Sequence, residues 1–311
     1  MKDKKLRIGI PNGSLVDPKR GGLQELLDRA RIYIKNIGAN APAEVTNIPW
    51  LEAAAGRPQE LPALAASGYC DVFFCGDDWA REWELRGKGS EKMLGLGIGK
   101  VEIVYAEKES SESTNAASEY PYLARWYLSQ KYAVPEAGIP IVKIGESIPE
   151  GSSLAVIESV GATEAKVYYG LAGAVVEASQ SGETLKNYGL TVRDTVMSSE
   201  CSLYCREGLD EWQRKKAERI AMMLEGAVNA QGKDLVILNV KNDDLDKVLD
   251  YIRENQLFAG EETIIQGKTM SEITLELPTR DCDKPLIDVL GDLNDLGATA
   301  IEGMPLSYSV K

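Results

Sequence analysis

The sequence predicts an α/β protein with a two-lobed main region and a smaller C-terminal domain. The first observation is an apolar strand, LRIGIP at residues 6–11, followed by a loop and by apolar residues at helical spacing from Leu23 to Ala30. The second is the glycine-rich stretch of residues 95–99, which leads into the strand-like VEIVYAE and indicates a crossover between two lobes. The third is the order strand, helix, strand, strand, helix, strand over residues 232–311, which is typical of a ferredoxin-like βαββαβ domain.

The remaining elements of the main region follow in order along the chain. A helix is expected after Glu60-Leu61-Pro62, and a strand at residues 71–75 opens through Gly76-Asp77-Asp78 into another helix. Ser118 to Pro121 should begin the helix LARWYLSQKY. Beyond residue 190 we expect one or two strands and then a long amphipathic helix over residues 212–230.

These patterns set the predicted domain boundaries. Lobe I comprises residues 1–105 and 191–231, lobe II comprises residues 106–190, and the ferredoxin-like domain comprises residues 232–311. The stretch IPEGSSLAVIES, near residues 145–160, indicates an added hairpin to which we assign no role.

Composition excludes several classes of protein. A chain of 311 residues that is 44% hydrophobic can bury a large core. Its net charge of −13 argues against binding to nucleic acids or to anionic membranes, since both reward surplus Lys and Arg. With no apolar run of about 18 residues and no signal peptide, the sequence predicts a cytoplasmic protein.

The numbers and spacing of cysteine and histidine residues exclude further kinds of structural and catalytic site. Five cysteines are too few for a disulfide framework at this length, and neither the pair Cys70 and Cys75 nor the pair Cys201 and Cys205 is spaced to chelate one metal on a strand. The chain has no histidine, which rules out a Ser-His-Asp triad and a histidine general base. The sequence identifies no set of metal ligands.

The stretch of residues 161–190 carries the strongest functional signal. Its centre, Ser179-Gln180-Ser181-Gly182-Glu183-Thr184, follows an apolar run and precedes a helical continuation. If Thr184 lies at a helix start, the backbone N–H groups and hydroxyls there favour a bound phosphate. The alternative is an ordinary Ser/Gly turn between two elements.

The wider pattern resembles the long form of ATP phosphoribosyltransferase, the enzyme of the first step of histidine biosynthesis. That family has a G-x-x-E segment, then G-L-A-D-A-I-V-D, a T-G-x-T-L loop and a closing N-G-L. The corresponding residues here are 161–164, 170–177, 181–185 and 187–190. The segments Arg57 to Pro62, Gly76 to Asp78 and Ser118 to Pro121 are similar to further motifs of the family, in the same order.

The resemblance implies a two-lobed catalytic region similar to periplasmic-binding-protein-like folds, and a C-terminal domain that carries feedback inhibition by histidine. It implies the displacement of pyrophosphate from phosphoribosyl pyrophosphate by N1 of ATP, with Mg²⁺ as cofactor and a homo-oligomer, either dimer or hexamer, as the assembly. Glu164 and Glu177 are the implied catalytic residues, near the ribose hydroxyls or the metal. The implied substrate contacts are Asn12, Gly13, Ser14, Arg57, Asp77, Glu102, Gly173, Ser181, Gly182, Glu183 and Thr184.

Several positions depart from the family pattern. Asn12-Gly13-Ser14 stands where the family usually has K-G-R, and Val101-Glu102-Ile103 stands where it has C-R-L. The family's A-D-A is Ala172-Gly173-Ala174 here, and its second Asp is Glu177. Each lost phosphate contact to arginine removes about 1.5–3 kcal/mol unless another residue replaces it. Arg57, Arg81 and Lys100 are the nearby candidates for that replacement.

Three hypotheses for the function therefore stand beside one another. The first is an ATP phosphoribosyltransferase with atypical phosphate contacts. The second is a related phosphoribosyltransferase whose small acceptor is not ATP, which a site with fewer cations would permit. The third is a non-catalytic small-molecule-binding protein, since a two-lobed architecture also suits solute binding. The Gly182-x-Thr184 loop favours the first two, and the missing Asp at Gly173 favours the second or the third.

Overall fold

The structure, a computed structural model, describes residues 4–17, 22–37, 41–109, 113–180, 182–257, 262–279 and 284–310. It divides into two compact units, Met1–Ala221 and Met222–Lys311. Helix α7 (Glu211–Asn229) contains the division, which therefore falls ten residues before the expected boundary between residues 231 and 232. In the described part of the chain, no helix combines the length and the apolar character needed to cross a bilayer.

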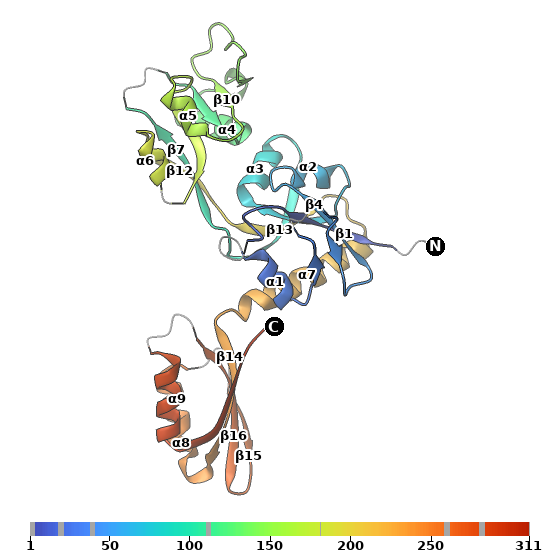
Figure 1. Cartoon of the computed structure of the whole chain (residues 1–311), viewed down its shortest axis with the longest axis vertical. Helices are drawn as coiled ribbons and strands as arrows, with labels where there is room; N and C mark the ends of the chain where they lie inside the picture. The colour runs from blue at the N-terminus through green and yellow to red at the C-terminus, as the bar shows by residue number, and fades with distance from the viewer. Residues whose placement is uncertain are drawn as a thin grey trace. The chain divides into compact units, whose positions relative to one another are not determined.

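The first sheet of the larger unit is built around strands buried on both faces. Its spatial order is β4 (Leu51–Gly56), β1 (Leu6–Pro11), β5 (Val72–Gly76), β13 (Cys201–Arg206) and β6 (Ser90–Gly95). β1 runs parallel to β4 and β5, as expected for strands that read as continuous apolar runs. The helices linked to these strands are α1 (Leu23–Arg29), α2 (Leu61–Ala66) and α3 (Asp77–Leu85) (Figure 1). A short hairpin pairs β2 (Ile34–Lys35) with β3 (Glu44–Val45).

The second sheet mixes parallel and antiparallel strands. Its spatial order is β12 (Thr191–Ser199), β7 (Val101–Glu107), β11 (Ala174–Ser179), β8 (Ala116–Ser118), β10 (Val156–Glu158) and β9 (Ile141–Lys143). Its helices are α4 (Pro121–Tyr132), α5 (Thr163–Tyr168) and α6 (Glu183–Asn187). Strands β9 and β10 pair in parallel, so the added hairpin expected near residues 145–160 is wrong: the intervening residues form a crossover loop.

The two sheets divide the chain at positions that differ from the expected lobe boundaries. The predicted lobe I includes residues 101–105 and 191–199, but β7 and β12 both lie in the second sheet. The reason is their long antiparallel pairing, which runs from Thr191 opposite Glu107 to Ser199 opposite Val101. The chain thus passes between the sheets twice, through residues 96–100 and through Glu200.

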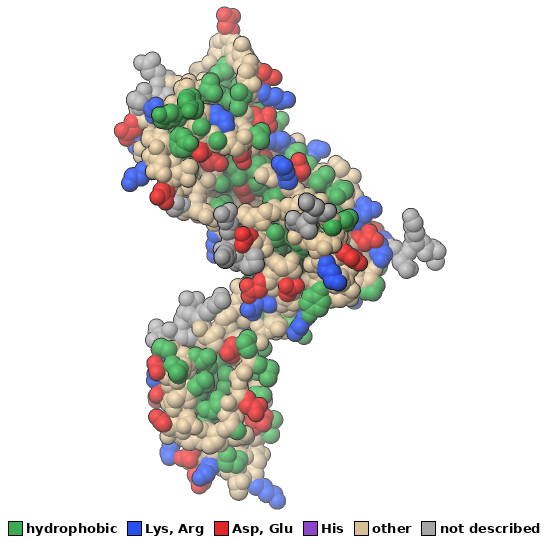
Figure 2. All heavy atoms as spheres, viewed as in Figure 1, with side chains coloured by type: hydrophobic (Ala, Val, Ile, Leu, Met, Phe, Trp, Pro, Cys, Tyr) green, Lys and Arg blue, Asp and Glu red, His purple; other side chains and the backbone are tan. Residues whose placement is uncertain are grey.

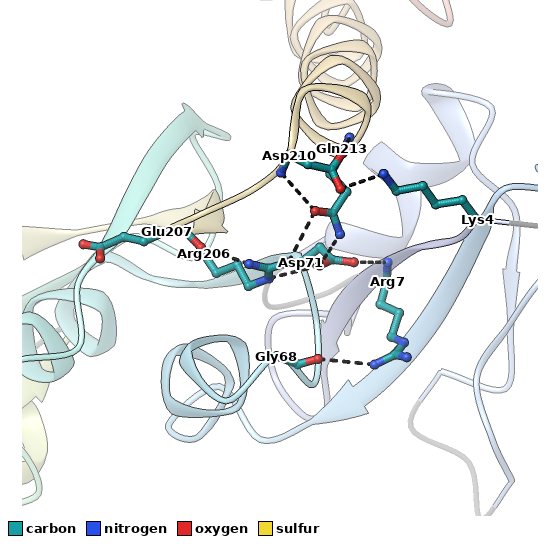
Figure 3. A network of polar contacts seen from close by, with 8 residues as sticks. All are labelled: Lys4, Arg7, Gly68, Asp71, Arg206, Glu207, Asp210 and Gln213. Carbon is teal, nitrogen blue, oxygen red and sulfur yellow. Dashed lines mark hydrogen bonds and ion pairs between the residues drawn. The ribbon is translucent and has the colours of Figure 1, made fainter.

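A polar network holds the amino-terminal edge of the first sheet together, and Figure 3 shows it from close by. The buried Asp71 accepts hydrogen bonds from the Arg7 backbone N–H, from Nε and Nη2 of Arg206 and from Nε2 of Gln213, all at 2.9–3.0 Å. Gln213 and Asp210 also cap the start of α7 reciprocally, each side chain accepting the other's backbone N–H. The Asp71 network therefore fixes β1, β5, β13 and α7 to one another.

The smaller unit is a single antiparallel sheet with its helices on one face (Figure 1). Its elements in chain order are β14 (Lys233–Lys241), α8 (Leu245–Glu254), β15 (Thr263–Gln266), β16 (Met270–Pro278), α9 (Leu286–Asp295) and β17 (Ala298–Pro305). Alternate residues of β16 are buried, which packs Ile273, Leu275 and Leu277 against the helices. The strand order β15-β16-β14-β17 is that of a ferredoxin-like domain, and the predicted fold class is confirmed.

Candidate active site

A cavity of about 750 Å³ opens in the larger unit where the carboxyl ends of β1, β4 and β5 meet the second sheet. Carboxyl ends of parallel strands are the usual place for ligands in open α/β sheets. The lining residues are Ser14, Leu15, Pro58, Gln59, Gly76, Asp78, Trp79, Gly99, Val101, Tyr120, Ala178, Gln180 and Ser199. We call this the larger cavity.

Among the described residues that line the larger cavity, Asp78 is the one with a charged side chain. It is 5% exposed, and its Oδ1 accepts a hydrogen bond of 2.6 Å from the Ser199 hydroxyl of β12. Tyr120 bonds to the same carboxylate, and its ring lies 4.3 Å, centroid to centroid, from the ring of Trp79. Burial raises the pKa of Asp78, and these hydrogen bonds oppose the rise. The cavity therefore combines aromatic faces with a buried hydrogen-bond acceptor.

A second cavity, of about 460 Å³, shares Val101, Ala178 and Gln180 with the first, so the two are neighbours. We call it the smaller cavity. Its remaining lining residues are Glu164, Glu177, Ser179, Gly182, Glu183, Thr184 and Leu185. It lies at the carboxyl end of β11, with the starts of α5 and α6 beside it.

Glu177 is held in the smaller cavity without full hydrogen bonding. Thr163 bonds to its carboxylate, but Oε2 is buried and has no partner within the described residues. Burial, and then the charges of Glu119 and Glu164, raise the pKa of Glu177 to about 7, against the effects of Thr163 and Lys166. An unpartnered buried oxygen costs free energy unless a ligand satisfies it. Glu177 is thus suited to receive hydroxyl donors or a cation.

The loop that leads into α6 has the form expected of a phosphate cradle. Gly182 precedes the helix with a φ of 70°, a left-handed conformation that favours glycine, and its N–H donates to the Ser179 hydroxyl. Glu183 and Thr184 are the first residues of α6, so their backbone N–H groups belong to the unpaired first turn. Ser181, the remaining predicted member of this loop, lies outside the described residues.

The structure brings together one group of the predicted site residues. Glu164, Glu177, Gly182, Glu183 and Thr184 all line the smaller cavity, and Ser14 lines the larger one. Beside the larger cavity, Asn12 and Gly13 are exposed in the same loop as Ser14, and Arg57 is exposed immediately before the lining residues Pro58 and Gln59.

Three predicted contacts have other roles in the described residues. Asp77 forms an ion pair with Lys92 at 2.8 Å and accepts a hydrogen bond from Tyr204; both partners belong to the first sheet, and Asp77 lines neither cavity. Glu102 is exposed and accepts a hydrogen bond from Ser198. Gly173 is buried just before β11, at the end opposite Ser179, where its N–H donates to the Asn115 carbonyl.

Sequence reasoning left out the residues at the floor of the larger cavity. From the sequence alone, Tyr120 and Ser199 are expected only as parts of a helix start and of a strand, and the predicted contact is Asp77 rather than Asp78. A signal for Asp78 does exist in the sequence. It stands four residues before Glu82, a spacing that places both carboxylates on one face of α3.

Figure 2 shows that charged side chains of both signs are mixed over the visible surface of the larger unit, with hydrophobic side chains gathered over α5. Tyr168, Tyr169 and Leu171 at this place are more than half exposed. They do not line either cavity.

The fold and the paired cavities define a two-lobed α/β protein that binds small molecules at the carboxyl edges of its strands. A family model described as HisG: ATP phosphoribosyltransferase matches residues 57–226. The chain belongs to the ATP phosphoribosyltransferase family, and the resemblance found in the sequence is confirmed.

Individual relatives cover most of the chain. An ATP phosphoribosyltransferase of Nitratidesulfovibrio vulgaris (strain Miyazaki F) is 31% identical over 262 residues, which cover 79% of this chain and 80% of the relative. One of Halobacterium salinarum is 27% identical over 308 residues, covering 95% and 96%. A solved ATP phosphoribosyl transferase (HisG:HisZ) complex from Thermotoga maritima is similar with a TM-score of 0.54, covering 71% of this chain and 98% of that one. At 18% identity, that structure shows a shared fold.

Enzymes of this family use a metal ion in catalysis. Within the described residues, no group of three or more Cys, Asp and Glu side chains is arranged to hold a metal ion. Mg²⁺ typically binds through one or two protein carboxylates together with phosphate oxygens of the substrate. The unpartnered Oε2 of Glu177, with Glu164 in the same cavity, fits such an open arrangement.

Proposed function

We propose that the two cavities are the substrate sites of an ATP phosphoribosyltransferase, which joins phosphoribosyl pyrophosphate to N1 of ATP and releases pyrophosphate in histidine biosynthesis. The observation that carries the assignment is the adjacency of the cavities, which share Val101, Ala178 and Gln180. A transfer between two substrates needs two sites in contact, with the reacting atoms at the shared wall.

Phosphoribosyl pyrophosphate belongs in the smaller cavity. Its 5-phosphate would accept hydrogen bonds from the backbone N–H groups of Glu183 and Thr184 and from the Thr184 hydroxyl. Glu183 is exposed, so its side chain does not need to enter the cradle. The ribose hydroxyls would then donate to Glu177 and Glu164, which satisfies the unpartnered Oε2 of Glu177.

ATP belongs in the larger cavity. The rings of Trp79 and Tyr120 offer apolar surface to the flat adenine, and Asp78 offers an acceptor to its exocyclic amino group. Ser14 and its exposed neighbours lie where they could contact the phosphates of the nucleotide.

The chain's residues position the reactants and place charge; none acts as a nucleophile. The adenine N1 lone pair forms a bond to the anomeric carbon as the bond to pyrophosphate breaks, and pyrophosphate leaves with the bonding electrons. Positive charge develops on the ribose ring, so a carboxylate at Glu177 stabilises the transition state electrostatically. Glu177 and Glu164 would hold Mg²⁺, which would supply positive charge to offset that of the pyrophosphate.

The C-terminal unit is proposed to carry the response to histidine, and the enzyme is proposed to work as a homo-oligomer, a dimer or a hexamer. The support is the ferredoxin-like topology, which is shared by small regulatory ligand-binding modules. Equilibrium sedimentation with and without histidine tests both proposals, and a monomer in both conditions would contradict the second.

The substrate assignment is tested by calorimetric titration with phosphoribosyl pyrophosphate and Mg²⁺, and then by a pyrophosphate-release assay with ATP. We expect binding and turnover in the wild type, and binding weakened by at least about tenfold in the Gly182→Ala, Thr184→Ala double variant. Binding without turnover on ATP would point to another acceptor. No binding would remove the transferase assignment of the cavities.

A further inference from the structure

Helix α3 presents two buried carboxylates to the second sheet, one turn apart. Asp78 lies at the larger cavity, and Glu82, which is 0% exposed, lies behind it and lines neither cavity. A buried carboxylate is costly unless hydrogen bonds offset its desolvation. Asp78 has a place in the proposed acceptor site, whereas the mechanism does not use Glu82.

The partners of Glu82 come from its own helix, through Arg86 at the end of α3, and from the start of α4. Its Oε1 accepts from Nε and Nη2 of Arg86 at 2.8 and 2.7 Å, and its Oε2 accepts from the backbone N–H of Leu123 at 2.7 Å. The N–H of Tyr122 also donates to Oε1, at 3.2 Å. Both N–H groups belong to the first turn of α4, where helices leave donors unpaired.

This cap is supplied from outside the helix that it stabilises. The residue before α4, Tyr120, gives no side-chain cap of its own. Glu82 therefore replaces the usual local cap with one from α3, and it places a carboxylate at the positive end of the α4 dipole. Arg86 completes the contact, because its guanidinium also lies 4.8 Å from the ring centre of Tyr122.

The cap acts on a residue of the cavity. Tyr120 is the last residue before α4, so the position of that helix start sets the position of its ring. The same ring lies against Trp79 and bonds to Asp78, both of α3. The contact between α3 and α4 thus has two parts. Asp78 and Tyr120 meet at the larger cavity, and Glu82 meets the start of α4 away from the cavity.

We propose that Glu82 is a positioning residue for the acceptor: by capping α4 from α3, it holds Tyr120 against Trp79 and Asp78 in the geometry that binds the adenine ring. This inference rests on the proposed function for the identity of the acceptor. The geometry itself, in which Glu82 fixes the start of α4, does not depend on turnover.

The test is the variant Glu82→Gln, which keeps the volume of the side chain but removes its negative charge. Its amide NH₂ group would also face donors that now bond to a carboxylate oxygen. We expect the KM for ATP to rise about tenfold, with the KM for phosphoribosyl pyrophosphate changing by less than about twofold, since only the larger cavity is affected. In a Tyr120→Phe background, the same change should have little further effect on the KM for ATP, because coupled residues are not additive. A lower kcat with both KM values unchanged, or equal rises in both, would overturn the proposal.

The matched control is Glu84→Gln. Glu84 lies on the same helix, is 58% exposed and pairs with Arg81 at 2.7 Å, so its loss should leave both KM values unchanged. If Glu82→Gln does not fold, Arg86→Lys keeps the charge but loses the two-pronged bond, and should raise the KM for ATP in the same direction by a smaller factor. An unchanged KM in folded Arg86→Lys would then count against the proposal.

A second measurement separates this inference from the proposed function. In protein labelled with 5-fluorotryptophan, the ¹⁹F resonance of Trp79, assigned with Trp79→Phe, should shift in Glu82→Gln while that of the distant Trp212 does not. A wild type without turnover would defeat the proposed function and leave this test intact. An unmoved Trp79 resonance in folded Glu82→Gln would defeat the positioning role itself.

Discussion

Asp71 and Glu177 are both carboxylates with little solvent contact, yet their surroundings are opposite. Asp71, at the amino-terminal edge of the first sheet, accepts from a backbone N–H, a guanidinium and an amide. Glu177, at the carboxyl end of β11, has Thr163 as a donor and a buried Oε2 without a partner. The hydrogen-bonding capacity of Asp71 is satisfied by donors of the chain itself, whereas Oε2 of Glu177 is left for a ligand to satisfy.

The difference separates a structural from a functional carboxylate without reference to any relative. A satisfied buried charge is part of what holds the fold, and removing it leaves its partners unpaired. An unsatisfied one destabilises the free protein and is repaired when a ligand binds. The two residues should therefore respond in opposite ways to substitution.

The largest effect is expected from Asp71→Ala. The Arg206 guanidinium and the Arg7 N–H would lose their acceptor, so the free energy of unfolding should fall by about 3 kcal/mol. The KM values of the folded enzyme should not change, because Asp71 precedes β5 whereas the larger cavity lies at its far end. Urea denaturation and steady-state kinetics check both parts. A loss of less than about 1 kcal/mol would show that Asp71 is not the satisfied partner described here.

Glu177→Gln should instead stabilise the free enzyme. A pKa of about 7 in the folded state, above its value in the unfolded chain, means that the wild type loses stability as the pH rises from about 4.5 to 7. The variant lacks this loss, so it should be more stable by about 1–3 kcal/mol at pH 8 and nearly equal to the wild type at pH 5. Denaturation at the two pH values checks this, and a destabilised variant at pH 8 would reverse the comparison.

The same ionisation should appear in ligand binding. If phosphoribosyl pyrophosphate and its metal need the ionised Glu177, the affinity of the wild type should fall as the pH drops below about 7. The phosphates of the ligand titrate in this range as well, so calorimetry on Glu177→Gln is the control. The variant should keep only the pH dependence that belongs to the ligand.

A smaller effect is expected from Gly182→Ala. Apart from the two neighbouring residues, no atom of the described part of the chain lies within 4 Å of the added methyl group, so the cost should come from the left-handed backbone and be about 1 kcal/mol of stability. The affinity for phosphoribosyl pyrophosphate should also fall. Gly170→Ala is the matched control, since Gly170 has a φ of 80°, equally open space and no place in either cavity. Equal losses of affinity in both variants would remove Gly182 from the cradle.

The smallest effect belongs to the rim of the Asp71 network. Lys4 bonds to Asp210 at 2.6 Å, but both side chains are about half exposed. Exposed pairs are screened by solvent and salt, so Lys4→Ala should leave the denaturation midpoint within experimental error. A clear shift would extend the structural role of this network to its surface.

The fold could be predicted because its patterns are local. Buried strands, a glycine crossover and the βαββαβ order each occupy a few contiguous residues, and the smaller cavity is built largely from residues 164–185. The error near residues 145–160 has the same origin, since apolar runs around a Gly-Ser turn look alike whether the strands pair in parallel or antiparallel.

The larger cavity was harder because its contacts join distant parts of the chain. Ser199 bonds to Asp78 across 121 positions, and the sequence around either residue does not indicate that the other will be its partner. Which of Asp77 and Asp78 reaches the cavity is decided by the phase of the helix. That phase places the carboxylate of Asp77 beside Lys92 and the carboxylate of Asp78 beside Ser199. Glu82 as a cap for α4 is likewise visible only when the sheets are brought together.

The pairing of Val101 with Ser199 at the root of the second sheet has a consequence for how such an enzyme can change. Directly opposed residues of antiparallel strands lie only about 5 Å apart, so the segment between them leaves the first sheet and returns at the same point. Residues 101–199 are therefore a cassette inserted in the other lobe. A cassette joined at one point can be exchanged between homologues by two crossovers, which would replace the phosphate cradle and Tyr120 while retaining Trp79, Asp78 and the loop residues of the acceptor pocket from the host.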